Sequence, residues 1–394
     1  MREEKKSSRF FCLVLLVAAI SVCMMSPVYA DMQATNGSSN FSDKVVPEYA
    51  KGFTVEYHDS YKVVRVLNAW RGCDKIFTYL LTEKGTPVPQ LDEECTVIEI
   101  PSERFVALST TYLSDMDVLG LTDRIIGVQS MKQVNTGSVQ SLYKEGKIRE
   151  VGGSSMASGI NLETLIDMHP DLVMTYATGN AEYDSHPKIQ EAGIPVVLNA
   201  EYMESTPLGR AEWIKFISVF FNKEKEANQY FEEIKTEYND VKGKVRESVK
   251  TRPSVVTGSS NKGTWNMPGG DSFVARFLED AGADYLWKND TTTGSIPLDF
   301  EVVYNKALDA DYWIDPGTVS SLDELKKEDG RYQDFFAYKH KSVYNDNARL
   351  NAGGGNDFWE SGMTHPQIIL KDLVKIFHPD LVPDHTLVYY KKIE

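Results

Sequence analysis

The sequence is poor in basic side chains and cysteines, and it lacks the short motifs of common enzyme classes. Its 394 residues include 42 Lys and Arg against 57 Asp and Glu, a formal net charge of −15. Nucleic-acid binding needs clustered basic residues, so this balance argues against a nucleic-acid partner. No HExxH, CxxC, GxGxxG or GxSxG occurs, and Gly258–Thr264 has the spacing of a phosphate loop without its lysine. We therefore expect neither catalysis nor a cofactor.

Residues 1–30 have the pattern of a signal peptide. A basic start precedes the apolar run Phe10–Met25, and Val28-Tyr29-Ala30 fits a signal-peptidase site. An uncleaved membrane anchor is one alternative, because the apolar segment approaches the length of a membrane span. Lipidation at Cys23 is another, because the three preceding residues resemble a bacterial lipobox except at Val22. We expect an exported protein, periplasmic or on the cell surface, with the mode of anchoring left open.

Cys73 and Cys95 are the two cysteines beyond residue 30. In an exported protein such a pair can form a disulfide. The two cysteines flank Ile76–Pro89, which we interpret as a strand pair with a Lys84-Gly85 turn. Two separate thiols are the alternative, and the sequence leaves both open.

The rest of the chain predicts an α/β protein with two lobes. Residues 31–52 are interpreted as a linker, and residues 53–103 alternate apolar and polar side chains, which predicts a small β-rich N-terminal extension. Short apolar runs then alternate with helical stretches in residues 104–208 and again in residues 253–394. Strand, helix and strand in succession predict a mostly parallel sheet covered by helices in each lobe. Asn161 is placed to cap one of these helices.

Residues 209–252 carry apolar side chains at helical spacing between the lobes. Asn222 is expected to interrupt this pattern, and Arg252-Pro253 to end it. A continuous helix over residues 223–249 would be about 40 Å long at 1.5 Å per residue. Such a helix must run along both lobes and forms a stiff connector.

Aromatic and polar residues follow several of the predicted strands. In open parallel sheets, ligands collect beyond the carboxyl ends of the strands. Loops from the two lobes would therefore line one cleft. The candidate ligand-binding residues are Thr111, Tyr112, Tyr176, Trp265, Asn266, Met267 and Arg349.

The order of these features resembles a class III substrate-binding protein of an ABC importer, the group that serves ferric siderophores, haem and cobalamin. The resemblance rests on Arg104–Ser109, Asn161–Leu165 with Pro170–Val173, the connector helix, and Pro268–Phe273 through Asp284. Residues Gly355–Trp359 to His378–Leu381 resemble an iron-complex subgroup. The likeness covers residues 104–390.

The resemblance implies a monomeric binding protein that delivers its ligand to a permease and its ATPase. In that family, one glutamate on each lobe contacts permease arginines. Glu163 and Glu301 match these positions, and both would begin helices. Clustered histidines of metal-ion binders are not seen in the expected cleft, so a ferric siderophore-type chelate fits better, with Arg349 pairing with an anionic complex. Cobalamin or haem on the same scaffold is the alternative, and a chelatase-like enzyme on a similar two-lobed fold is a lower one.

Overall fold

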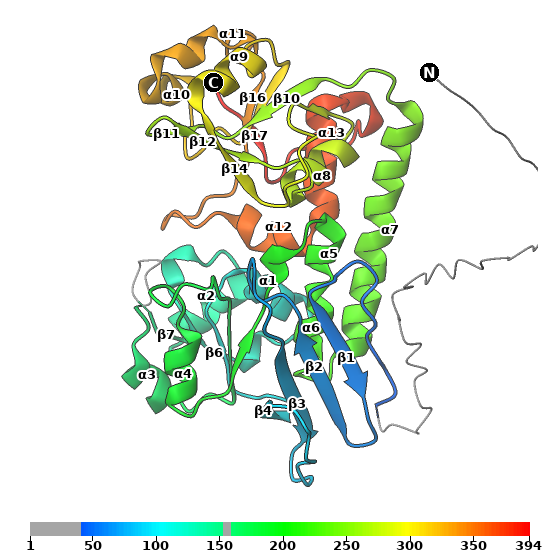
Figure 1. The fold of residues 1–394 in the computed structure, drawn as a ribbon, viewed down its shortest axis with the longest axis vertical. Coiled ribbons are helices and arrows are strands. Elements are labelled where there is room, and N and C mark those ends of the chain that lie inside the picture. The colour runs from blue at the N-terminus through cyan, green and yellow to red at the C-terminus, as the bar shows by residue number, and fades with distance from the viewer. Residues whose placement is uncertain (1–40, 153–158) are drawn as a thin grey trace, which may run out of the picture. The chain divides into compact units, whose positions relative to one another are not determined.

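Four sheets and their flanking helices make up the folded chain, as Figure 1 shows for the computed structural model. The structure describes residues 41–152 and 159–394; the expected signal peptide and Cys23 lie outside the described residues. The described residues all belong to one compact unit. The α/β class with two helix-flanked, mostly parallel sheets is confirmed.

Residues 53–100 form the expected β-rich element, a sheet in the order β1-β2-β3-β4. Strands β1, β2 and β3 pair antiparallel, whereas β4 runs parallel to β3. The expected strand pair within Ile76–Pro89 does not form. β3 ends at Glu83, and Pro87 and Pro89 then lack the N–H groups that a returning strand would donate. The strands are β1 (Phe53–Tyr57), β2 (Tyr61–Val66), β3 (Phe77–Glu83) and β4 (Thr96–Ile100).

This sheet shares a hydrophobic core with the N-terminal lobe. Val64 and Tyr79 lie in the same buried cluster as Phe105 and Leu172 of the parallel sheet. The Tyr79 hydroxyl also accepts a hydrogen bond from the backbone N–H of Leu198 at 2.9 Å. The two sheets on either side of the expected boundary at residue 103 therefore pack as one lobe. The sheet β1-β2-β3-β4 is a further layer of that lobe and not a separate extension.

A buried ion pair joins the same sheet to the connector helix. Lys62 in β2 has no exposed surface, and its ammonium group pairs with Glu224 at the start of that helix. The ammonium group also donates to the Val219 carbonyl at 3.0 Å and to the Asn222 side chain at 2.7 Å. A buried lysine needs such partners because an uncompensated charge is costly away from water.

The second half of the expected linker is firmly held. The buried Glu212 carboxylate accepts the backbone N–H groups of Glu48, Tyr49 and Ala50 at distances between 2.7 and 3.0 Å. Glu204 accepts the next two N–H groups of the chain at 2.9 Å. The interpretation of residues 31–52 as a linker is thus wrong for residues 48–52, because two carboxylates more than 150 positions away hold this backbone.

The N-terminal lobe contains a five-stranded parallel sheet in the order β7-β6-β5-β8-β9. The Asn161 side chain caps α3 as expected, accepting the Thr164 N–H at 3.0 Å. The strands are β5 (Phe105–Ala107), β6 (Ile125–Val128), β7 (Arg149–Glu150), β8 (Leu172–Thr175) and β9 (Val196–Leu198). The helices are α1 (Thr111–Val118), η1 (Thr122–Arg124), η2 (Met131–Gln133), α2 (Gly137–Lys144), α3 (Leu162–Asp167), α4 (His186–Glu191) and η3 (Glu201–Met203).

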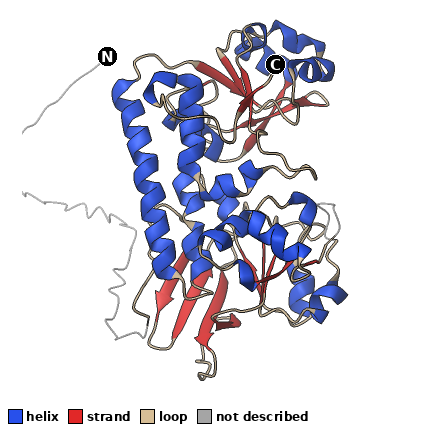
Figure 2. Ribbon diagram, turned by 180° about the vertical axis from the view of Figure 1, so that it is seen from behind, coloured by secondary structure: helices blue, strands red, loops and turns tan. Residues whose placement is uncertain are grey.

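The connector consists of α5 (Pro207–Ala211), α6 (Trp213–Ser218) and the long helix α7 (Glu224–Ser248). Asn222 has a positive φ of 54° and separates α6 from α7, as expected. The 25 residues of α7 span about 37 Å at 1.5 Å per residue. Ala227 belongs to the core of the N-terminal lobe, whereas Phe231 and Val245 belong to that of the C-terminal lobe. One straight helix therefore contributes to both cores, and Figure 2 shows it alongside both groups of strands.

The C-terminal lobe contains a five-stranded sheet, β13-β10-β15-β16-β17, and a three-stranded antiparallel sheet, β11-β12-β14. β17 is the antiparallel strand of the larger sheet. The strands are β10 (Ser254–Thr257), β11 (Ser260–Asn261), β12 (Thr264–Pro268), β13 (Asp284–Tyr285), β14 (Ser295–Asp299), β15 (Tyr312–Ile314), β16 (Val343–Asn345) and β17 (Lys391–Lys392). The helices are α8 (Phe273–Asp280), α9 (Phe300–Ala307), α10 (Leu322–Glu328), η4 (Gly330–Asp334), α11 (Phe336–Lys339), η5 (Asp357–Trp359), α12 (Ser361–Thr364), α13 (Pro366–Phe377) and η6 (Pro379–Leu381).

Cys73 and Cys95 are both free thiols in the structure, so the disulfide that the sequence left open is not formed. Among the described residues, no helix has the length and apolar character needed to cross a membrane. The expected signal segment lies outside those residues, and its alternatives stay predictions.

Candidate functional site

The N-terminal lobe has a small hollow where its parallel strands end. Tyr176 directly follows β8 and lines this shallow hollow together with Leu108, which follows β5. The Tyr176 side chain is 37% exposed. Thr111 lies nearby in sequence at the start of α1, where its hydroxyl and that of Ser109 are 2.9 Å apart. The structure thus places Tyr176 at a concave surface, as expected from its position after a strand.

Tyr112 lies beneath that surface. Its side chain is only 1% exposed, and burial together with the charge of Glu201 raises its pKa well above the usual value. The ring contributes to the core of the N-terminal lobe. Tyr112 can therefore support the site from below but offers almost no surface to a ligand.

The C-terminal lobe has a larger hollow at the carboxyl ends of β10, β15 and β16. Its open volume is about 610 Å³. Gly258, Asp315 and Asp346 each follow directly after one of these strands and line it. The remaining lining residues are Thr257, Asn266, Pro268, Phe273, Val274, Phe277, Leu278, Ile314, Phe358, Trp359, Leu373 and Tyr390.

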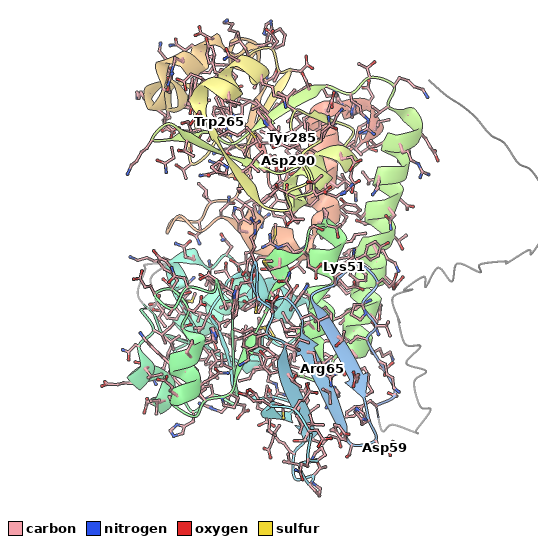
Figure 3. The ribbon with its side chains drawn as sticks, viewed as in Figure 1. Lys51, Asp59, Arg65, Trp265, Tyr285 and Asp290 are labelled. Carbon is pink, nitrogen blue, oxygen red and sulfur yellow. The ribbon has the colours of Figure 1, made fainter. Side chains whose placement is uncertain are left out.

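Two of the predicted ligand-binding residues on β12 face the core and not this hollow. Trp265 and Met267 have no exposed surface, and the Trp265 indole donates to the Thr257 carbonyl at 2.8 Å. Figure 3 labels Trp265 within the C-terminal lobe. Asn266, which lies between them, is exposed and lines the hollow. The prediction for Trp265 and Met267 is wrong because alternate side chains of a strand point to opposite faces. A sequence run cannot place all three residues on the same side.

Arg349 is also placed differently from its expected role. Its Nε atom lies 2.6 Å from Oδ2 of the buried Asp357, and its side chain is 55% exposed. Asp357 neutralises the guanidinium, and Arg349 does not line either hollow described above. The structure therefore gives no support to Arg349 as the partner of an anionic ligand.

Arg210 in α5 lies between the two hollows, and no pattern in the sequence indicated it. Its guanidinium lies 5.0 Å from the ring centre of Phe273 and 5.8 Å from that of Trp359, two residues that line the C-terminal hollow. The same side chain forms an ion pair with Glu201 of the N-terminal lobe. Tyr202, next to Glu201, meets Tyr176 at the N-terminal hollow with ring centres 6.4 Å apart. A continuous strip of aromatic and charged groups thus runs from one hollow to the other.

The loop between β2 and β3 brings two further residues to this region. The Trp70 ring lies against Gly179, three residues after Tyr176, and leaves no room there for a Cβ atom. The Arg71 guanidinium lies against Gly294 of the C-terminal lobe. Arg71 is exposed, and no carboxylate partner is found for it among the described residues. The N-terminal sheet therefore reaches the gap between the lobes, a contribution that its local sequence pattern did not indicate.

The segment from Leu350 to Thr364 ties the C-terminal lobe to the N-terminal lobe. Glu360 has no exposed surface, and its carboxylate accepts the backbone N–H groups of Asn135 and Thr136, each at 2.7 Å. The Thr364 hydroxyl donates to Asp115 in α1 at 2.9 Å. The two lobes are thus joined by a polar latch in addition to α7.

Glu163 and Glu301 occupy equivalent local positions on the two lobes. Glu163 is exposed in the first turn of α3, and Glu301 is exposed in the first turn of α9. Glu301 lies 3.3 Å from Arg331, another exposed side chain. Both carboxylates are therefore accessible to a partner protein. Among the described residues, no group of three or more His, Cys, Asp or Glu side chains could hold a metal ion.

Comparisons with known proteins agree on one family. A family model described as periplasmic binding protein matches residues 105–350. An uncharacterized lipoprotein of Methanocaldococcus jannaschii is 30% identical over 359 residues, which cover 84% of this chain and 82% of that protein. A second uncharacterized lipoprotein of the same organism is 28% identical and covers 80% of each chain.

Solved structures show the same fold at low sequence identity. A periplasmic binding protein from Veillonella parvula aligns with a TM-score of 0.56 and 17% identity, covering 83% of this chain and 95% of its own. A possible iron-binding, periplasmic solute-binding protein from Staphylococcus epidermidis aligns with a TM-score of 0.54 and 20% identity, covering 70% and 98%. A periplasmic heme binding protein from Pseudomonas aeruginosa gives 0.53 and 15%, covering 74% and 98%.

Proposed function

The chain belongs to the periplasmic binding protein family, whose members bind solutes and are not enzymes, and from this premise we propose a transport function. The protein captures a metal chelate of the ferric siderophore type between its two lobes, outside the cytoplasmic membrane, and delivers it to an ABC permease. The observation that carries this proposal is the pair of hollows at the carboxyl ends of parallel strands, one in each lobe. Ligands of open α/β sheets collect at such ends.

A bulky organic chelate suits this site better than a bare ion. The C-terminal hollow is walled mainly by aromatic and aliphatic side chains, including Phe273, Phe358 and Trp359. Aromatic faces stack on organic ligands, whereas a metal ion needs several oxygen, nitrogen or sulfur ligands. Two of the structural neighbours, the possible iron-binding protein and the heme binding protein, support the same class of ligand.

Closure on the ligand is a small movement in this proposal. α7 contributes to both cores, and the Glu360 latch and the Thr364–Asp115 hydrogen bond tie the lobes at two further points. Opening the gap widely would break these buried contacts. The strip that contains Arg210 and Tyr202 adjusts around the ligand while the lobes stay together.

Delivery uses the exposed glutamates of the two lobes. Glu163 and Glu301 would contact arginines of the permease, which its ATPase drives. Charges at two separated points fix the orientation of a docked protein and speed its encounter. The protein works as a monomer in this scheme. Lipid attachment through Cys23 would keep it near the membrane, and the lipoprotein descriptions of its relatives support that route.

Isothermal titration calorimetry of residues 31–394 tests ligand capture. The panel contains ferric hydroxamate and catecholate siderophores, haem and cobalamin. One siderophore class should bind at micromolar concentration or below and quench the fluorescence of Trp359, which is 43% exposed and lines the hollow. In Trp359→Phe, quenching should be lost while calorimetric binding persists. Saturable binding of haem or cobalamin alone would replace the siderophore with that ligand, and no binding across the panel would overturn the proposal.

Uptake by cells or by permease-containing vesicles tests delivery. The Glu163→Gln/Glu301→Gln double variant should bind the chelate with unchanged affinity and lose transport. Glu182→Gln/Glu247→Gln is the matched control, because it removes two other exposed carboxylates and the same net charge. Normal uptake by the docking variant, or equal loss in the control, would contradict the assignment of Glu163 and Glu301.

A further inference from the structure

The C-terminal hollow has two carboxyl groups at its floor. β15 and β16 are neighbouring parallel strands, with Ile314 in register with Tyr344. Asp315 directly follows β15 and Asp346 directly follows β16, so both residues lie at the carboxyl ends of these strands. The backbone N–H of Asp315 donates to the Tyr344 carbonyl at 2.9 Å. The two side chains therefore enter the hollow close together.

These carboxyl groups have few partners. The Tyr390 hydroxyl donates to Oδ2 of Asp315 at 3.2 Å, and the Asn356 amide donates to Oδ1 of Asp346 at 3.2 Å. The second oxygen of Asp315, Oδ1, is buried and has no hydrogen-bond partner. No lysine or arginine is among the described residues that line the hollow. A buried acceptor without a partner is costly, so the free oxygen marks a place for a donor.

Among the residues that the structure describes along the hollow, no side-chain cation pairs with either carboxyl group. Burial raises the pKa of Asp346 to about 6, and burial together with the charge of Asp346 raises the pKa of Asp315 well above its usual range. Two neighbouring carboxylates resist carrying two negative charges in a poorly solvated site. A bound cation would remove that resistance and supply the missing hydrogen-bond donor at once.

The surroundings of the pair favour an organic cation over a metal ion. Two carboxylates are too few to replace the hydration shell of a metal ion, and the remaining walls are mostly apolar. The rings of Phe358 and Trp359 are perpendicular neighbours, with centres 4.9 Å apart. Aromatic faces attract ammonium groups, and desolvation strengthens this attraction.

We propose that the C-terminal hollow binds an ammonium group of the ligand, with Asp315 and Asp346 as its anionic partners and the rings of Phe358 and Trp359 beside it. The inference rests on the proposed function, because it describes one end of the same ligand. The cargo is then a metal chelate that bears a free amine and not the anionic complex that Arg349 would have required.

Calorimetry with matched probes tests the proposal. The first pair is ferrioxamine B, a ferric hydroxamate with a free amine, and its N-acetylated form, which has the same metal centre and no ammonium charge. The second pair is n-pentylamine, a primary ammonium cation at neutral pH, and its neutral N-acetylated form, N-pentylacetamide, which need no chelate site. A charge-assisted hydrogen bond changes affinity by roughly tenfold to a hundredfold, so each cation should bind at least about tenfold more tightly than its neutral partner.

Variants assign the preference to the two aspartates. In Asp315→Asn the preference for the cation should fall to near unity, and in Asp346→Asn it should fall in the same direction. Asp323→Asn, on the exposed face of α10, should keep it. Thermal unfolding establishes that each variant is folded, and agreement between the two isosteric variants guards against a local defect in either one.

The outcomes separate this inference from the proposed function. A preference for n-pentylamine that Asp315→Asn removes supports the ammonium site even when neither ferric probe binds, and the siderophore panel then decides the chelate proposal separately. Equal binding of ferrioxamine B and its acetylated form, without discrimination of n-pentylamine, overturns the ammonium site and leaves chelate capture intact. A preference that survives in both aspartate variants also overturns it. Failure of all four probes to bind overturns the ammonium site.

Discussion

The latch at Glu360 gives the sharpest prediction about how the two lobes are held together. Its carboxylate has no exposed surface and accepts hydrogen bonds from the backbone N–H groups of Asn135 and Thr136, from the Thr136 hydroxyl and, at 3.4 Å, from the Asn135 side-chain amide. Burial raises the pKa of Glu360, and the two N–H groups and the hydroxyl oppose the shift. The donors therefore stabilise a charge that the protein interior disfavours.

Glu360→Gln keeps the shape of the side chain but turns an NH₂ group toward donors. At least one of the backbone N–H groups of Asn135 and Thr136 then loses its acceptor. A hydrogen bond to a charged group contributes about 1.5–3 kcal/mol, and an unsatisfied buried donor costs about 1–3 kcal/mol. We expect local opening of residues 135–136 to become easier by about 2–3 kcal/mol, which is roughly a 30- to 150-fold change in the opening equilibrium.

Hydrogen exchange followed by mass spectrometry measures this directly. Peptides that contain residues 135 and 136 should exchange at least about 30-fold faster in Glu360→Gln, whereas peptides from α10 should be unchanged. Thr136→Val removes only the hydroxyl donor and should give a smaller effect of about 1–2 kcal/mol. Exposed Glu182→Gln is the control for loss of charge. Unchanged exchange around residue 135 in Glu360→Gln would refute the idea that this carboxylate holds the lobes together.

Three further predictions concern other buried or bridging groups. Lys62→Met should destabilise the protein by about 3–5 kcal/mol in thermal or urea unfolding, because it leaves Glu224 buried without its cation. Adding Glu224→Gln should recover much of that loss. Full stability of the single variant would contradict this reasoning. Burial raises the pKa of Asp115 to about 8 from 3.8, so the folded state keeps a proton that the unfolded chain has released, and stability should fall as pH rises from about 4 through about 8. Asp115→Asn should flatten that part of the melting-temperature profile, and an identical profile would reject the shift. Arg71→Ala should weaken binding of the identified chelate about tenfold, the effect of losing one charge-assisted hydrogen bond to a chelate oxygen, at unchanged melting temperature, because its guanidinium lies against the C-terminal lobe without a carboxylate partner among the described residues. Lys75→Ala in the same loop should not weaken binding.

Local signals in the sequence were sufficient for the elements that depend on near neighbours. Asn161 and the turn that follows it form a capping unit within four residues, and the Asn222 break needs only the local backbone. The stripe on α7 identifies a buried face from helical spacing alone. These features need no knowledge of distant partners, so the order of strands and helices, the two lobes and the stiff connector could be predicted.

The site depended on information that is not local. Trp265 and Asn266 are adjacent in sequence, yet the pairing of β12 with β14 sends one into the core and the other toward the hollow. Arg210 becomes part of the site because α5 packs between the lobes, and Trp70 and Arg71 because their sheet shares the core of the N-terminal lobe. Sequence position after a strand was a sound guide for Tyr176 and did not distinguish surface from core for Tyr112.

By itself, the sequence determined the class of protein: acidic, and built of two α/β lobes on a rigid helix. Only the tertiary structure decided which polar side chains are buried and what they face. Glu212 lies more than 160 residues from the backbone that it holds, and Asp315 and Asp346 become neighbours only because β15 and β16 pair. An aspartate or glutamate is written with the same letter in the sequence whether water or apolar side chains surround it. The pKa of its carboxyl group follows from those surroundings.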